Sequence, residues 1–196
     1  MPETVRFDPR ELLALYLNPA QLDCYYELLM EQNRRVNLVS RETRRADFDR
    51  MVAESLLPLV SLPVSMKGYI DIGSGGGLPA IPILMSGAID GECTLVERTG
   101  KKARALEEIL SGLGLNVRVV PVNFEEIREI RRTQLVTLRY IKLSESLLNK
   151  IMSSLGPSGR FVYYSTPAFD IKGLTFKVYQ FESQASIVKS FTVFSR

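Results

Sequence analysis

Apolar residues recur at helical spacing through the first third of the chain and at strand-like intervals after it. The clearest helical face is Leu22, Tyr25, Tyr26, Leu29 and Met30, spaced by one, three or four residues. The pattern predicts helices over residues 9–17, 19–33 or 19–36, and 46–57. Further on it predicts helices over 101–113 and 144–155, and strands over 69–72, 93–97, 117–120, 134–138, 159–164, 175–181 and 187–194.

Strands that alternate with helices indicate one fold class. Such crossovers produce a mostly parallel sheet covered on both faces, so we expect an α/β, Rossmann-like fold. Its seven-stranded sheet should end in an antiparallel pair. We therefore divide the chain into an N-terminal helical extension, residues 1–66, and a ligand-binding domain, residues 67–196.

Composition narrows the class of protein. A chain of 196 residues suffices for one sizeable core. It shows no apolar stretch long enough to cross a bilayer and no signal peptide, and Cys24 and Cys93 form neither a disulfide framework nor a metal motif. We expect a cytoplasmic protein without a metal. The absence of histidine excludes Ser-His-Asp triads, Cys-His pairs and histidine-bearing metal sites.

The most informative stretch is YIDIGSGGGLP, residues 69–79, where a predicted strand turns into a helix. Gly73, Gly75 and Gly77 allow positive φ and let the backbone approach a ligand without a Cβ clash. The following helix offers free N–H groups at its start. The spacing G-x-G-x-G is not the dinucleotide G-x-G-x-x-G, and the Gly-Lys-Ser/Thr ending of a phosphate loop is missing, so nucleotide phosphate is disfavoured.

Two acids flank this loop at the ends of neighbouring predicted strands. Asp71 suits a cationic ligand, because a carboxylate there would repel a phosphate. Glu97 ends the next strand, where an acid can hydrogen-bond a ribose diol. S-Adenosylmethionine carries an ammonium, a sulfonium and a ribose, so the loop and the two acids predict a site for it. The alternative is a strand-capping Asp71 and a solvated Glu97.

Other candidate residues also follow predicted strand ends. Ligands of open parallel sheets bind beyond the carboxyl ends of the strands, where Asn123 and Arg139 join Asp71 and Glu97. In this fold class the turn after the third strand commonly flanks the adenine. Asn123 and Phe124 are therefore candidate ring contacts.

An arginine-rich segment precedes the ligand-binding domain. It contains Arg34, Arg35, Arg41, Arg44, Arg45 and Arg50, with Glu42, Asp47 and Asp49 among them. The net charge of the whole chain is only +3, so a nucleic-acid partner has to be inferred from this cluster. The sequence supports phosphate contact and a solvated surface equally.

Together these segments resemble the bacterial 16S rRNA guanine-N7 methyltransferase family known as RsmG or GidB. The most specific segment is DIGSGGGLPAIP, residues 71–82, which is close to the family's D(V/I)G(S/T)GxGxPGIP. YYELL at 25–29, followed by NRRVNL at 33–38, looks like a second family motif. Further matches are Val96-Glu97 with Lys101-Lys102 and Leu106, the pair Glu125-Glu126, and Arg139.

The resemblance implies a class I S-adenosylmethionine-dependent methyltransferase that acts on 16S rRNA or the small ribosomal subunit, and we expect a monomer. It implies that Arg139 is catalytic and orients the base or a nearby phosphate, with an ion pair to a neighbouring acid as the alternative. The implied cofactor-binding residues are Asp71, Gly73, Ser74, Gly75, Gly77, Leu78, Glu97, Asn123, Phe124 and Glu125.

The chain departs from the family pattern in the half that would face RNA. Met51 stands where the family has histidine, Asn123 where it has arginine, and Tyr140 where it has alanine. Ser165 and Thr166 replace a lysine-glycine pair. Two other functions therefore stay open: a methyltransferase of another RNA or a small molecule, and a catalytically silent relative that binds RNA or a partner through its arginines.

Overall fold

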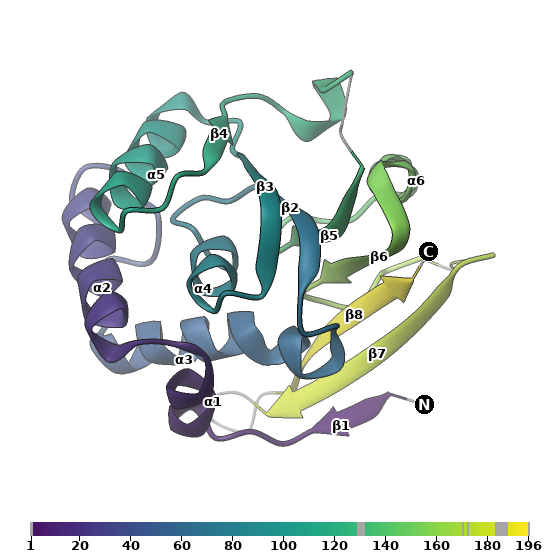
Figure 1. Cartoon of the computed structure of the whole chain (residues 1–196), viewed down its shortest axis with the longest axis horizontal. Helices are drawn as coiled ribbons and strands as arrows, with labels where there is room; N and C mark the ends of the chain where they lie inside the picture. The colour runs from purple at the N-terminus through teal and green to yellow at the C-terminus, as the bar shows by residue number, and fades with distance from the viewer. Residues whose placement is uncertain (1, 129–131, 170, 172, 183–187, 196) are drawn as a thin grey trace.

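The computed structural model describes residues 2–128, 132–169, 171, 173–182 and 188–195. Within these residues, helices flank one eight-stranded sheet (Figure 1). The strands are β1 (Glu3–Val5), β2 (Met66–Ile72), β3 (Ile89–Val96), β4 (Arg118–Val120), β5 (Thr133–Leu138), β6 (Leu155–Tyr163), β7 (Thr175–Glu182) and β8 (Val188–Ser195). The helices are α1 (Pro9–Tyr16), α2 (Pro19–Asn33), α3 (Arg45–Leu56), α4 (Ala80–Met85), α5 (Gly100–Gly112) and α6 (Glu145–Ser154), with 3₁₀ turns η1 (Leu57–Ser61) and η2 (Phe124–Glu126).

The strand order explains where a ligand would bind. The order across the sheet is β1-β7-β8-β6-β5-β2-β3-β4. β2 pairs in parallel with both β3 and β5, and β8 runs antiparallel to its neighbours β6 and β7. The chain winds outward from β2 through β3 to β4, then returns to the other side of β2 as β5. That reversal places a crevice beyond the carboxyl ends of β2, β3 and β5.

The mostly parallel α/β fold is confirmed, and the sheet has one strand more than the seven expected. The additional strand is β1, which pairs in parallel with β7 through Thr4 and Gln180. Three residues carry too little periodicity to predict a strand. The expected start of the last strand, Ile187, lies outside the described residues, whereas the antiparallel β7–β8 pair is confirmed.

β6 begins at Leu155, four residues before the predicted start at residue 159, so the GPSG segment at residues 156–159 lies inside it. Leu155 pairs with Thr133, and the next registered pair joins Arg160 to Leu135. The four intervening residues therefore bulge from the ladder, and Ser158 takes a φ of 58°.

Local capping fixes the predicted helix starts. Asp8 Oδ1 accepts a hydrogen bond from Arg10 N at 2.7 Å, and Asn18 Oδ1 accepts one from Ala20 N at 2.9 Å. The third helix ends at Leu56, one residue before the expected end, but the chain continues as η1 through Pro58. Proline is tolerated there because the first turn leaves its N–H position unpaired anyway.

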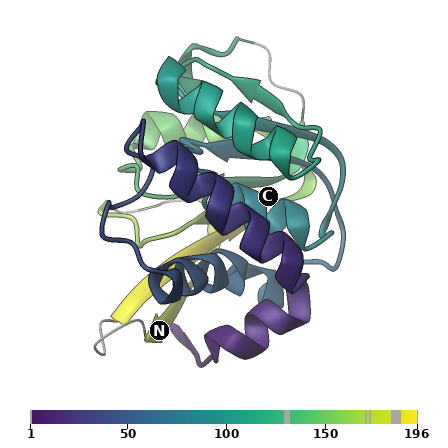
Figure 2. The same cartoon turned by 90° about the vertical axis from the view of Figure 1, so that its left-hand side faces the viewer.

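Two hydrophobic clusters cover the two faces of the sheet. Strand alternation sends Tyr69 to one face, with the side chains of α1 to α5, and Ile70 to the other, with α6. Figure 2 shows α2 lying between α5 and α3 in the first layer. The division of the chain at residues 66 and 67 stays a prediction, although the first three helices share this cluster with the sheet.

Among the described residues, none of the helices combines the length and apolarity that a membrane span needs.

Helix α2 is joined to the loop that follows β2. The Tyr25 hydroxyl donates a hydrogen bond to the Gly76 carbonyl at 2.8 Å, in a buried position. A Cβ at Gly76 would lie 2.8 Å from Leu29 Cδ1 and 3.1 Å from Leu38 Cβ. Only glycine therefore allows the loop to approach α2 this closely.

Gly76→Ala should lower the free energy of unfolding by about 1–3 kcal/mol, because fully buried Leu29 has little room to move away. Chemical denaturation measures the change. Gly100→Ala is the matched control, since a Cβ there meets nothing within 4 Å; it should leave stability unchanged or raise it by up to about 1 kcal/mol. Equal stability of the two variants would contradict the close packing of the loop.

Candidate active site

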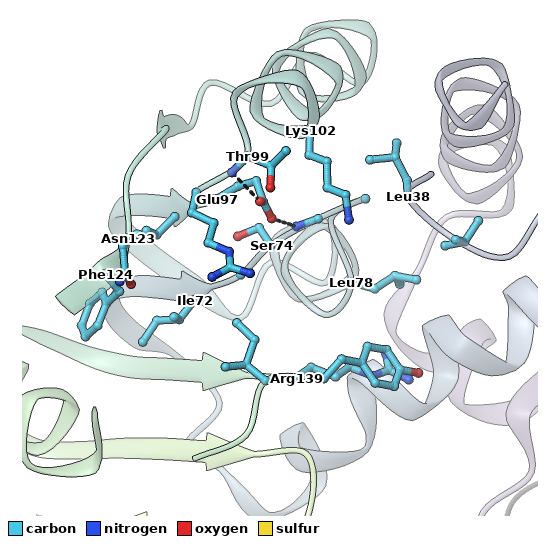
Figure 3. A pocket seen from close by; sticks show the side chains of 18 of the residues that line it. Leu38, Ile72, Ser74, Leu78, Glu97, Thr99, Lys102, Asn123, Phe124 and Arg139 are labelled. Carbon is cyan, nitrogen blue, oxygen red and sulfur yellow. Dashed lines mark hydrogen bonds between the residues drawn. The ribbon is translucent and has the colours of Figure 1, made fainter. Parts of the chain in front are cut away.

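A cavity of about 470 Å³ opens beyond the carboxyl ends of β2, β3 and β5 (Figure 3). Its volume is in the range of small-molecule sites. Its walls come from the α2–α3 connection, the loop after β2, the start of α5, and the segments after β4 and β5. The lining includes Leu38, Val39, Ser40, Thr43, Met51, Ile72, Gly73, Ser74, Gly75, Gly76, Leu78, Val96, Glu97, Arg98, Thr99, Lys102, Val122, Asn123, Phe124, Arg139, Tyr140 and Ile141.

The glycine loop presents bare backbone to this cavity. Gly73 N and Ser74 N donate to the Val96 carbonyl at 2.7 and 3.1 Å, which holds the loop against β3. Gly75 has a φ of +52°, and a Cβ there would meet only Gly73 O, at 3.8 Å, among the described residues. A Cβ at Gly73 would lie 2.2 Å from Ile141 Cδ1. We call this loop the cradle, because its bare backbone leaves space for a ligand that side chains at positions 73 and 75 would fill.

Glu97 is a structural support of the cradle and is not solvated. Its carboxylate accepts hydrogen bonds from Gly75 N at 3.0 Å and from Thr99 N at 2.8 Å, and the residue is 6% exposed (Figure 3). Each carboxylate oxygen has a second lone pair. Glu97 therefore fits the expected ribose contact while it holds the loop.

Asp71 lies beneath the loop and does not line the cavity. It is 1% exposed, Oδ1 accepts a hydrogen bond from Thr137 Oγ1 at 2.5 Å, and Oδ2 has no hydrogen-bond partner among the described residues. Burial raises the pKa of Asp71 to about 6, and the Thr137 hydrogen bond opposes that rise. At neutral pH a buried negative charge therefore lies under the cradle, which suits a cationic ligand.

Arg139 forms a buried ion pair, which was the alternative reading of this residue. Its Nη2 lies 3.0 Å from a Glu54 carboxylate oxygen, and its Nη1 donates to Ser55 Oγ at 2.8 Å and to the Met51 carbonyl at 3.2 Å. Lys189 Nζ lies 3.0 Å from the other Glu54 oxygen. Arg139 is 5% exposed and lines the cavity, so it contributes a positively charged wall.

The structure brings most of the predicted site residues together. Those that line the cavity are Gly73, Ser74, Gly75, Leu78, Glu97, Asn123, Phe124 and Arg139. Gly77 is not among them; a Cβ there would lie 2.3 Å from Ile81 Cδ1. Glu125 contacts α6 instead, where its Oε1 accepts a hydrogen bond from Ser146 Oγ at 3.4 Å.

Several cavity residues were missed by the sequence reasoning. The α2–α3 connection reaches the cavity because buried Asn33 accepts hydrogen bonds from Leu38 N at 2.8 Å and Val39 N at 3.0 Å. The NRRVNL motif and the arginine-rich segment both cover this connection, but neither identified Leu38 or Val39 as cavity residues. Lys102, which the sequence marked only as part of a family match, is directed toward the cavity in Figure 3.

The arginine-rich segment serves packing in part. Arg45 pairs with Asp23 at 2.6 Å and Asp49 at 2.7 Å, and its guanidinium carbon lies 5.4 Å from the centre of the Tyr26 ring. Arg41 Nε donates to Asn37 Oδ1 at 3.4 Å, beside the cavity wall.

Metal chemistry has no candidate site in the part of the chain that the structure describes: no group of His, Cys, Asp and Glu side chains there could hold an ion.

Solved methyltransferases share this fold. The Bacillus cereus O-methyltransferase, solved with S-adenosylhomocysteine (SAH), aligns with a TM-score of 0.67 over 95% of this chain and 96% of that chain, at 12% identity. A Listeria monocytogenes protein described as a class I S-adenosylmethionine-dependent methyltransferase aligns with a TM-score of 0.61 over 91% and 69%, at 8% identity. The fold is that of the class I methyltransferases.

Sequence comparison is more specific. The GidB family model, described as rRNA small subunit methyltransferase G, matches residues 18–193. The Helicobacter pylori ribosomal RNA small subunit methyltransferase G is 30% identical over 149 residues, 76% of this chain and 82% of that protein. The Rhodopseudomonas palustris protein of the same name is 42% identical over 96 residues, 48% of this chain and 43% of that protein. The chain belongs to the rRNA small subunit methyltransferase G family of S-adenosylmethionine-dependent enzymes.

The charge of Asp71 should be visible in the pH dependence of stability. Its pKa is about 6 in the folded protein against 3.8 for the free side chain, so the folded state keeps a proton that the unfolded state has lost. Stability should therefore fall as the pH rises from about 4 to 6, by roughly 3 kcal/mol in total. Asp71→Asn should lack that fall.

The same variant should bind S-adenosylmethionine at least tenfold more weakly at pH 7, because the buried negative charge is gone. Denaturation at several pH values and calorimetric titration measure the two effects. A variant with the wild-type pH slope would show that Asp71 is not the titrating group.

Glu97→Ala should weaken S-adenosylmethionine binding at least a hundredfold, because it removes both the ribose acceptor and the support of the loop. Gly75→Val should do the same by filling the cradle. Glu107→Ala, which changes an exposed acid on α5, should leave the dissociation constant within twofold of wild type. Titration calorimetry checks all three variants, and unchanged affinity in the first two would place the cofactor elsewhere.

Proposed function

We propose that this chain transfers a methyl group from S-adenosylmethionine to N7 of a guanine in the 16S rRNA of the small ribosomal subunit. The observation that carries the proposal is the family match over residues 18–193. The cavity at the carboxyl edge of the sheet supports it independently, because its residues fit the cofactor chemically.

Different residues around the cavity would bind different parts of the cofactor. The bare backbone at Gly73 and Gly75 leaves room for the methionine part, with the negative charge of Asp71 beneath it. Glu97 would accept hydrogen bonds from the ribose hydroxyls. Asn123 and Phe124 lie at the left-hand side of the cavity in Figure 3, and we propose that this side binds the adenine.

The chemistry needs no imidazole. When bound, S-adenosylmethionine supplies an electrophilic methyl group, and guanine N7 has a lone pair that can attack it before any proton leaves the base. The protein's contribution is then alignment and exclusion of water, which convert binding energy into rate. A chain without histidine is sufficient for this reaction.

The charge around the cavity suits an RNA substrate. Arg98 and Lys102 line one side, and Arg41 lies on the segment that forms another. Arginine and lysine side chains at a rim attract a phosphate backbone. Arg139 supplies further positive charge within the wall, and its ion pair with Glu54 fixes its position. The expectation of a cytoplasmic monomer stays a prediction.

A strain that lacks the gene should lose one 7-methylguanosine from its 16S rRNA, measured by mass spectrometry of nuclease digests. Complementation with the wild-type gene should restore the modification, and complementation with Glu97→Ala should not. Purified protein should transfer label from methyl-labelled cofactor to rRNA or small subunits of the deletion strain. Unchanged rRNA in the deletion strain would contradict the proposal, and cofactor binding without transfer would favour the silent relative.

A further inference from the structure

Tyr140 is an unusual residue at the rim of the cavity. It directly follows Arg139 after β5 and lines the cavity, yet 78% of its surface is exposed. Its neighbour Ile141 also lines the cavity and is 37% exposed. Two consecutive residues, one aromatic and one aliphatic, are therefore in contact with both solvent and the cavity.

The backbone of Tyr140 is strained. Its φ is 59°, in the left-handed region that disfavours residues with a Cβ and that glycine adopts readily. A bulky residue in this conformation lowers stability, and such strain clusters at functional sites. Because the side chain is mostly exposed, burial does not compensate for the strain.

The ring rests on a rigid support. The guanidinium carbon of Arg139 lies over the Tyr140 ring, 4.9 Å from its centre. Arg139 is itself held by Glu54 and Ser55. A cation over one face of the ring orients it and leaves the opposite face available. The ring is therefore positioned before any substrate arrives.

We propose that Tyr140 is the platform on which the target purine of the RNA stacks, an inference that rests on the proposed function. A base can reach an enzyme cavity only when it has left its own stack, and an aromatic side chain at the entrance replaces the stacking that is lost. The exposed ring beside the cofactor cavity meets this need. Ile141 adds apolar surface to the same part of the cavity lining.

The proposal treats Tyr140 as a substrate contact that the family pattern does not supply. The family motif that this chain resembles has alanine after the arginine, where this chain has Tyr140; the platform is therefore proposed for this chain and not for the family. Stacking on an aromatic side chain depends on the π face and not on the hydroxyl group. Tyr140→Phe should therefore retain methyl transfer to the RNA, and Tyr140→Ala should lose it.

The test compares Tyr140→Ala with Tyr140→Phe in methyl transfer to undermethylated 16S rRNA or small subunits. Tyr140→Ala should raise KM for RNA and lower kcat/KM about 10- to 100-fold, the range expected for one lost base–aromatic stack. Its dissociation constant for S-adenosylmethionine should stay within twofold of wild type. Tyr140→Phe should keep kcat/KM within threefold. Val64→Ala, an exposed apolar residue outside the cavity lining, should match wild type.

A third variant separates stacking from folding. Tyr140→Gly should raise the thermal unfolding midpoint, because glycine relieves the positive φ, and should lose RNA methylation as Tyr140→Ala does. A gain in stability together with a loss of transfer cannot come from misfolding.

Three results would overturn the inference while leaving the proposed function intact. They are wild-type kcat/KM in Tyr140→Ala, a Tyr140→Phe variant as impaired as Tyr140→Ala, and a loss of S-adenosylmethionine affinity in Tyr140→Ala that accounts for the lost transfer. Absence of rRNA methylation by the wild-type protein would overturn the proposed function and this inference together.

Discussion

The site depends on one interaction, the attachment of the glycine loop to the end of β3. The Val96 carbonyl accepts hydrogen bonds from Gly73 N and Ser74 N, and the Glu97 carboxylate accepts one from Gly75 N. A loop of small residues has many conformations to lose on folding, and these contacts select one. Because β2 and β3 are adjacent parallel strands, they bring the loop and its acceptors to the same edge. The cavity exists because that edge is fixed.

A second set of contacts joins the early helices to the strand ends. Glu54 on α3 pairs with Arg139 after β5 and with Lys189 on β8, and all three residues are far apart in the sequence. Removing either partner of a buried ion pair leaves an uncompensated charge, which is costly. The pair therefore holds α3 against the carboxyl edge of the sheet, where Met51 and the α2–α3 connection complete the cavity wall.

The sequence predicted the features that depend on residues close together along the chain. Strand and helix periodicity predicted the α/β fold, and the glycine spacing with Asp71 and Glu97 predicted the position of the pocket. The sequence could not show which of the candidate site residues face the cavity. Whether Asp71 lies in the cavity or below it, and whether Arg139 is free or paired, depends on contacts with Thr137 and Glu54, distant along the chain.

The conformation of Tyr140 was also impossible to predict from the sequence. The sequence marked it only as a departure from a family motif, because neither backbone conformation nor exposure can be read from one tyrosine among several. The positive φ and the guanidinium beneath the ring emerge only once β5 has been placed in the sheet.

The pairing of β1 with β7 has a consequence for biosynthesis. Thr4 lies opposite Gln180, so β1 can pair with its neighbour only after all the helices and strands between them, and β7 itself, have been translated. Contacts of such long sequence separation are slow to form, because the closure of a large loop costs entropy first. We therefore expect the β1–β7 pairing to form later than the parallel pairs at the centre of the sheet, whose strands are closer in sequence.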